Sequence, residues 1–184
     1  LLLTYQMTWP GKKLNFMGNE FAQQQEWRIN HELDWYLLGQ KQHSGIQAAH
    51  RDLNHYYKHI PALHQLDFSA EGFHWIDCQD ADQSVICYVR REREGMFILV
   101  VLNFTPIPRT GYRIGVPVTG IYREIFSSDS IYYGGSNIGN AGSIASTHEP
   151  WMGFLDSISI TLPPLAGIIF SLQDSYESNS RRNK

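Results

Sequence analysis

The sequence predicts a mostly β protein, with an antiparallel β-sandwich preceded by a helix–strand–helix piece of a (β/α)8 barrel. After about residue 66 the chain contains seven short runs rich in Val, Ile, Phe and Tyr, separated by turn formers. That spacing is typical of a sandwich. Before that point, two segments with apolar residues at helical spacing flank one short apolar run.

The first element is a predicted helix over residues 1–9, ended by Pro10-Gly11. Its apolar face consists of Leu1, Leu2, Tyr5 and Trp9. The chain opens inside this apolar segment without Met and without a helix-start signal. We therefore expect a C-terminal fragment of a longer enzyme. Residues 13–17 form the short apolar run and are predicted to be a strand.

A long polar and aromatic segment, residues 18–43, has no sustained period and is predicted to be a loop, the kind of segment that often carries function. Ser44 then opens a helix, with Gln47 completing a capping box, and Pro61 ends it. The apolar face of this helix consists of Ile46, Ala49, Leu53, Tyr56 or Tyr57, and Ile60. Helix, strand, loop and helix follow in the order of one barrel unit preceded by the previous helix.

The sandwich strands are predicted over residues 73–76, 84–89, 96–104, 112–114, 122–126, 157–162 and 167–172. Residues 133–153, rich in Gly, Ser and Asn, are predicted to be an irregular loop, and the polar tail 174–184 to be disordered. The chain therefore divides into a barrel remnant over residues 1–65 and an all-β domain over residues 66–173, followed by the tail.

Composition excludes several classes of function. A net charge of −3 with scattered Lys and Arg does not favour nucleic acid or an anionic membrane. No apolar run approaches the ~18 residues of a membrane span. Two cysteines, Cys78 and Cys87, do not make a disulfide framework, and we expect small thiols in a reducing, cytoplasmic location.

Glu20, Glu26 and Asp34 are the carboxylates at the centre of the long loop. A retaining glycosidase or transglycosylase needs a nucleophile and an acid/base carboxyl group about 5–5.5 Å apart, and Glu20 with Glu26 is one possible pair. We favour a simpler role, in which these carboxylates cap loop backbone, pair with Arg28 or Lys41, or hydrogen-bond sugar hydroxyls.

Three aromatic residues of the same loop, Trp27, Trp35 and Tyr36, could stack on sugar rings or pack the loop onto its neighbours. Packing is the favoured role for Trp35, whereas the two roles are balanced for Trp27. His55 and His59 lie four residues apart on the predicted helix, but without further ligands they do not indicate a metal site. No phosphate-binding or nucleophile motif is present, so we expect no cofactor and no metal.

An ordered set of motifs spans residues 1 to about 173. It consists of Pro10-Gly11-Lys12-Lys13, Phe16 to Gln23, Glu26-Trp27, Leu33-Asp34-Trp35, Arg51-Asp52-Leu53-Asn54, Leu66-Asp67-Phe68, Gly72-Phe73, Asn103-Phe104-Thr105-Pro106, Asp129-Ser130, Gly135-Ser136-Asn137 and Leu162-Pro163-Pro164-Leu165. This set resembles the glycogen (1,4-α-glucan) branching enzymes of the α-amylase clan. Each motif alone is weak evidence for this family, whereas the ordered set of motifs across two domains is specific to it.

The resemblance implies a glycosyltransferase of glycogen biosynthesis that moves an α-1,4-glucan segment to a 6-hydroxyl through a covalent glycosyl-enzyme. The family's catalytic carboxylates lie on earlier barrel strands and match no residue here, so we expect this chain to have no catalytic residue and to be inactive alone. The implied partners are an α-glucan and the missing N-terminal part of the same enzyme. The implied substrate-binding residues, on the barrel rim, are Asn19, Glu20, Glu26, Trp27, Asp34 and Trp35.

Two alternatives stay open. One is a hydrolase of the same clan, which would not be expected to share both the residue 18–27 motif and the Leu162–Leu165 motif. The other is a stand-alone carbohydrate-binding sandwich, which would need an exposed aromatic platform at Trp75 or Trp151. We also expect residues 1–60 to be poorly stable alone or to pack against a second copy, because an incomplete barrel leaves open strand edges.

Overall fold

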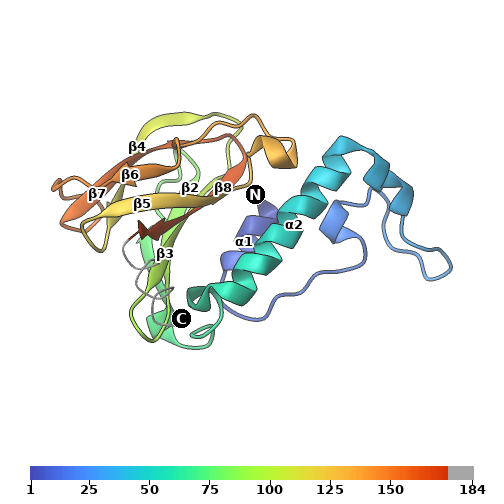
Figure 1. The fold of residues 1–184 in the computed structure, drawn as a ribbon, viewed down its shortest axis with the longest axis horizontal. Helices are drawn as coiled ribbons and strands as arrows, with labels where there is room; N and C mark the ends of the chain where they lie inside the picture. The colour runs from blue at the N-terminus through green and yellow to red at the C-terminus, as the bar shows by residue number, and fades with distance from the viewer. Residues whose placement is uncertain (174–184) are drawn as a thin grey trace, which may run out of the picture.

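The computed structural model describes residues 1–173, which form a small sheet, a large sheet and a layer of two helices (Figure 1). The helices are α1 (Leu2–Thr8) and α2 (Lys41–His59). The strands are β1 (Phe73–Asp77), β2 (Val85–Arg91), β3 (Phe97–Asn103), β4 (Arg109–Val116), β5 (Ile121–Ser127), β6 (Ser143–Ala145), β7 (Asp156–Leu162) and β8 (Ala166–Leu172). Single 3-10 turns are η1 (Asn19–Phe21), η2 (Trp35–Gly39), η3 (Pro61–Leu63), η4 (Ala70–Gly72) and η5 (Ile131–Tyr133).

Every strand pair in the two sheets is antiparallel. The large sheet has the order β1-β2-β3-β8-β5-β6, and the small sheet pairs β4 with β7. The central pair of the large sheet is β3 and β8, in which Val101 lies opposite Ile168. The prediction of a mostly antiparallel β protein is therefore confirmed, and all seven predicted strands are present.

Side chains of β3 alternate between two hydrophobic cores. Leu99 and Val101 pack between the two sheets, whereas Ile98 and Val100 pack against the helices. A strand that is buried on both faces needs apolar residues at every position, because successive side chains point to opposite faces. This explains why β3 is a continuous apolar run instead of an alternating one.

The helical layer covers the face of the large sheet that points away from β4 and β7 (Figure 1). Met7 of α1 and Leu53 of α2 are buried in its core. Gly167 of β8 permits the close approach of α1, since a Cβ there would lie 2.6 Å from Cγ2 of Thr4. Neither helix in the described part of the chain is long and apolar enough to cross a membrane.

A buried arginine joins the helical layer to the sandwich. Arg90 of β2 is fully buried and forms an ion pair of 2.5 Å with Asp67, whose side chain is 5 % exposed. Its other N–H groups donate to the carbonyl oxygens of Thr8 at 2.5 Å, Gly72 at 3.2 Å and Leu63 at 3.4 Å. One side chain therefore fixes the end of α1 and the chain between α2 and β1 onto β2.

The predicted strand at residues 13–17 is wrong. The segment is coil that leads into a turn at Met17, and Leu14, Phe16 and Met17 are exposed by 78 %, 53 % and 48 %. A strand satisfies its backbone N–H and C=O groups through a neighbouring strand, and within residues 1–173 none pairs with this segment. The segment is instead tied to α1, where the Gln6 side chain donates to the carbonyl of Leu14.

The predicted capping box of Ser44 and Gln47 is also wrong. Helix α2 begins three residues earlier, at Lys41, and its N-cap Gln40 makes no side-chain cap. The Ser44 hydroxyl donates back to the carbonyl of Gln40 at 3.1 Å, a bond that serine forms readily inside a first helical turn.

The stretch at residues 133–153, predicted to be irregular, contains the three-residue strand β6, which pairs with the edge of β5. So short a strand, rich in small residues, is fixed by its tertiary pairing and has no period of its own to detect. The tail predicted to be disordered, residues 174–184, lies outside the described residues.

Stability is expected to rise with pH between about 8 and 10.5 through Lys13. Its amine donates to the Trp9 carbonyl and lies 5.2 Å from the centre of the Tyr57 ring. Burial, with a smaller contribution from the Arg90 charge, lowers its pKa from 10.5 to about 8, although Asp67 opposes the shift. The unfolded chain therefore binds more protons in this window, so raising the pH favours the folded state.

Nuclear magnetic resonance of the 13C-methylated lysines checks this expectation. The Lys13 signal should titrate near pH 8, and Lys13→Gln should remove both that signal and its part of the pH-dependent rise in stability. A Lys13 midpoint above pH 10 would contradict the expected shift.

Candidate functional site

The polar and aromatic segment after residues 13–17 docks onto the start of α2. Phe21, in η1, is completely buried, and its carbonyl is hydrogen-bonded to Nδ1 of His43 at 2.9 Å. The turn around η1 uses left-handed backbone at Gly18 (φ 86°) and Ala22 (φ 54°). These anchors hold the base of the segment, while residues 23–36 extend outward.

Three of the six predicted substrate-binding residues line one cavity of about 200 Å³: Glu26, Trp27 and Asp34. Tyr36, which is 70 % exposed, lines the same cavity. The Trp27 ring is 41 % exposed and meets the edge of the Phe16 ring at a centroid distance of 5.9 Å. The cavity thus combines two accessible aromatic rings with three carboxylates, the third being that of Glu32. We call it the rim cavity.

Asp34 is held in place from its backbone. Its N–H donates to Oε1 of Gln23 at 2.9 Å, and the Gln23 amide donates in turn to the carbonyl of Gln25 at 2.9 Å. The carboxylate oxygen Oδ2 of Asp34 is buried and accepts no hydrogen bond from the described residues. A buried acceptor of this kind ordinarily has a partner, so it is suited to a hydroxyl group or a water molecule.

The other three predicted residues lie outside the rim cavity. Glu20 accepts a hydrogen bond of 3.1 Å from the Asn15 side chain, and Trp35 packs on Phe21 with ring centroids 5.2 Å apart. Asn19 lines a different, largely apolar cavity of about 360 Å³ beside α1 and α2. These residues shape the segment, and the packing expected for Trp35 is confirmed.

The ion pairs considered for Glu20 and Glu26 are not formed. In the described part of the chain, neither carboxylate pairs with Arg28 or Lys41. Arg28 lines the rim cavity instead.

The structure adds further polar residues to the rim cavity that the predicted site did not contain: Gln23, Gln25, His31 and Glu32. Gln23 reaches Asp34, eleven residues later, because the segment folds back on itself. No periodicity in the sequence reports such a fold-back, so only the density of polar residues between 23 and 32 hinted at a shared site.

The histidine pair of α2 forms a local contact. The rings of His55 and His59 are 4.1 Å apart, and Nδ1 of His59 is hydrogen-bonded to the carbonyl of His55 at 2.8 Å. Among residues 1–173, no three His, Cys, Asp or Glu side chains are grouped as ligands for a metal ion.

Of the two aromatic platforms considered, Trp75 belongs to an aromatic cluster. Its ring lies 4.9 Å from that of Phe73 and 5.6 Å from that of Trp9, and the residue is 36 % exposed. Trp151, which is 48 % exposed, lies beside a separate surface cavity that Tyr112 also lines.

This chain is highly similar to known proteins along most of its length. The chain is 68 % identical over 169 residues to the 1,4-alpha-glucan branching enzyme GlgB of Nitrosomonas eutropha, a match that covers 92 % of this chain and 23 % of that protein. It is 66 % identical over 174 residues to GlgB of Nitrosomonas europaea, covering 95 % of this chain and 24 % of that protein. The chain thus spans about a quarter of the length of these relatives.

A solved structure resembles the fold. The alpha-amylase from H.orenii superposes with a TM-score of 0.58, covering 93 % of this chain and 34 % of that one at 14 % identity. Residues 75–173 match the family described as alpha amylase, C-terminal all-beta domain. This match contains all the strands from β2 to β8, so the chain belongs to the alpha amylase C-terminal all-beta domain family.

Proposed function

We propose that this chain is the C-terminal part of a 1,4-α-glucan branching enzyme. The observation that carries the proposal is an identity of 66–68 % with two proteins of that name, extending over more than nine-tenths of this chain. That identity includes the segment before residue 75, outside the matched family domain. The rim cavity lies in this earlier segment.

In this proposal, residues 1–65 complete the catalytic barrel and residues 66–173 form a sandwich that braces it. The ion pair between Arg90 and Asp67, and the burial of α1 and α2 against the large sheet, support such a brace. Residues 13–17 would become a barrel strand only when neighbouring strands pair with them, since within residues 1–173 no strand does so.

The rim cavity would hold an α-glucan chain near the active site. The rings of Trp27 and Tyr36 offer apolar faces to sugar C–H groups, and Glu26 and Asp34 accept hydrogen bonds from sugar hydroxyls. Asn19, Glu20 and Trp35 belong to the same substrate-binding segment and support its conformation, as described above.

Branch formation is a transfer with retained configuration. A carboxylate attacks the anomeric carbon, an acid/base carboxyl protonates the leaving oxygen, and a 6-hydroxyl then displaces the enzyme carboxylate. One α-1,4 bond breaks and one α-1,6 bond forms, so the number of reducing ends does not change. We assign neither catalytic role to Glu20, Glu26 or Asp34. The part of Glu26 and Asp34 is to bind hydroxyl groups, and Glu20 supports the conformation of the segment.

The same proposal assigns the chain to the cytoplasm, where glycogen is made. Both cysteines are free thiols, with Cys78 exposed and Cys87 buried. Burial raises the pKa of the Cys87 thiol, which keeps it protonated and unreactive. The partners implied are an α-glucan and the remainder of the enzyme.

A hydrolase of the same clan is the second candidate. The fold similarity to an alpha-amylase is compatible with it, but the identity there is 14 %, against 68 % for a branching enzyme. Hydrolysis differs from transfer in one measurable respect, because each cleavage by water creates a reducing end.

The chain alone is expected to bind amylose without changing it. Its migration in a native gel should be retarded by embedded amylose, while iodine colour and reducing ends in solution stay constant. Loss of colour without new reducing ends would mean that these residues contain a complete transferase, contrary to the roles assigned above. Loss of colour with rising reducing ends would favour the hydrolase.

A further inference from the structure

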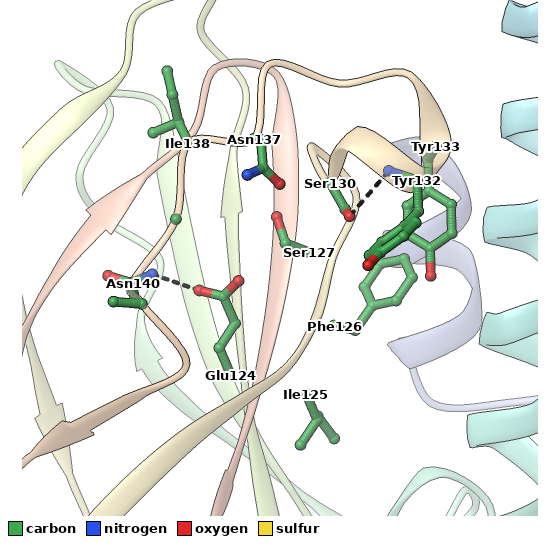
Figure 2. A pocket seen from close by; sticks show the side chains of 12 residues that line it. Glu124, Ile125, Phe126, Ser127, Ser130, Tyr132, Tyr133, Asn137, Ile138 and Asn140 are labelled. Carbon is green, nitrogen blue, oxygen red and sulfur yellow. Dashed lines mark hydrogen bonds between the residues drawn. The ribbon is translucent and has the colours of Figure 1, made fainter.

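A second polar cavity, of about 460 Å³, opens on the sandwich between β5 and the loop that follows it (Figure 2). We call it the sandwich cavity. Its size is within the range of small-molecule sites. The side chains that matter for recognition are Glu124, Ser127, Ser130, Tyr132, Asn137 and Asn140.

The loop wall of this cavity is built around the buried Asp129. One carboxylate oxygen accepts the Ser136 N–H at 3.0 Å, and the other accepts the Ser136 hydroxyl at 2.6 Å and the Ile138 N–H at 3.0 Å. A Cβ at Gly135 would lie 2.1 Å from the Asp129 carbonyl oxygen, so the turn closes only with glycine. The wall is therefore formed before any ligand arrives.

The far end of the loop is fixed to the helical layer. The Tyr133 hydroxyl donates to Asp52 of α2 at 2.8 Å. Gly45 lets the helix approach closely, because a Cβ there would lie 2.4 Å from the Tyr133 carbonyl oxygen. Such anchoring lowers the entropic cost of binding, since little loop ordering remains to be done.

The cavity offers both an acceptor and a donor. The Glu124 carboxylate is positioned by the Asn140 side chain at 2.7 Å and by the Asn140 backbone N–H, and a carboxylate has further lone pairs to share. Asn137 accepts the Ile131 N–H through Oδ1 at 3.3 Å, whereas its Nδ2 makes no hydrogen bond to the described residues. Figure 2 shows Glu124 on β5, with Asn140 beside it, and Asn137 on the loop above.

Hydroxyls and a ring complete the lining. The Ser127 and Ser130 oxygens accept backbone N–H groups of the loop, which leaves their hydroxyl hydrogens to donate. The Tyr132 ring is 86 % exposed and lies on the opposite side of the cavity from Glu124 (Figure 2). An exposed ring beside a fixed set of donors and acceptors suits a ligand with one apolar face and many hydroxyl groups.

We propose that the sandwich cavity binds a glucose unit of an α-glucan, as a second glucan site distinct from the rim cavity. The negative Glu124 disfavours anionic ligands, and the neutral amide and hydroxyls match a polyol. The choice of α-glucan among polyols rests on the proposed function. Two sites on one protein would hold a long glucan chain at two points and raise its local concentration.

Maltotriose titration of the 15N-labelled chain tests the proposal. Amide signals from residues 127–140 should shift with a common dissociation constant. Tyr132→Ala and Asn137→Asp should each raise that dissociation constant about threefold to tenfold, as expected for loss of one ring or one hydrogen bond. Asn137→Asp keeps the acceptor for Ile131 and tolerates the left-handed backbone (φ 62°), and it replaces the N–H donor by a charged acceptor.

Two controls make the test specific. Ile131→Ala removes an exposed side chain of the same loop that does not line the cavity, and it should leave the constant unchanged. Trp151→Ala, on another face of the sandwich, should do the same.

Two outcomes would overturn this second site. In one, maltotriose shifts only signals of residues 23–36, which leaves the proposed function standing. In the other, no signal from residues 127–140 moves at millimolar maltotriose. The transferase assignment is tested separately by an activity assay, so failure of one proposal is distinguishable from failure of the other.

Discussion

Arg90→Ala is expected to lower the free energy of unfolding by about 3–5 kcal/mol, the range observed when one partner of a buried ion pair is removed. The change leaves the Asp67 carboxylate, only 5 % exposed, without its cation. It also removes the donors to the carbonyls of Thr8, Leu63 and Gly72. Urea unfolding followed by tryptophan fluorescence measures the loss.

A neighbouring arginine is the matched control. Arg91 lies next along β2 and contacts the Phe97 ring with its cation at 5.5 Å, so Arg91→Ala should cost below about 1 kcal/mol. Adding Asp67→Asn to Arg90→Ala should recover part of the loss, because the unpaired charge disappears. Equal destabilisation by the two arginine changes would contradict the role given to Arg90.

The second expected result concerns Trp27, in an enzyme that can turn over. We take the full-length relative from Nitrosomonas eutropha and replace its matching segment with this chain. In that chimera, Trp27→Ala should lower kcat/KM for amylose about tenfold, which corresponds to about 1.4 kcal/mol of lost ring contact with the sugar. The fold should tolerate the change, because Trp27 is 41 % exposed.

The control for Trp27 is Ile29→Ala in the same segment. Ile29 is 81 % exposed and does not line the rim cavity, so kcat/KM should not change. An equal loss in both variants would mean that the segment acts through its conformation. No loss in either would remove the rim cavity from the substrate path.

The strands of the sandwich were predictable from the sequence because each buries a run of β-branched and aromatic residues. In β3, both faces are covered, and the six consecutive apolar residues before Asn103 leave no ambiguity. The strand predicted at residues 13–17 was wrong because a short apolar run predicts a strand whether or not a neighbouring strand is present to pair with it. Pairing is a tertiary property that a local pattern does not contain.

The candidate site was predictable in part. Carboxylates and tryptophans in one loop pointed to the rim cavity, where Glu26, Trp27 and Asp34 meet. The sequence did not separate these from Glu20 and Trp35, because the fold-back around Gln23 decides which side chains face inward. Likewise, the burial of Arg90 reflects four partners that come from distant parts of the chain.

The most direct test of the central claim is the activity of the chimera with its residues unchanged, measured on amylose by iodine colour and reducing ends together. If this chain is the C-terminal part of a branching enzyme, colour should fall at a rate close to that of the parent enzyme while reducing ends stay constant. A folded chimera that leaves the colour unchanged, or one that releases reducing ends in step with the loss of colour, would contradict the assignment.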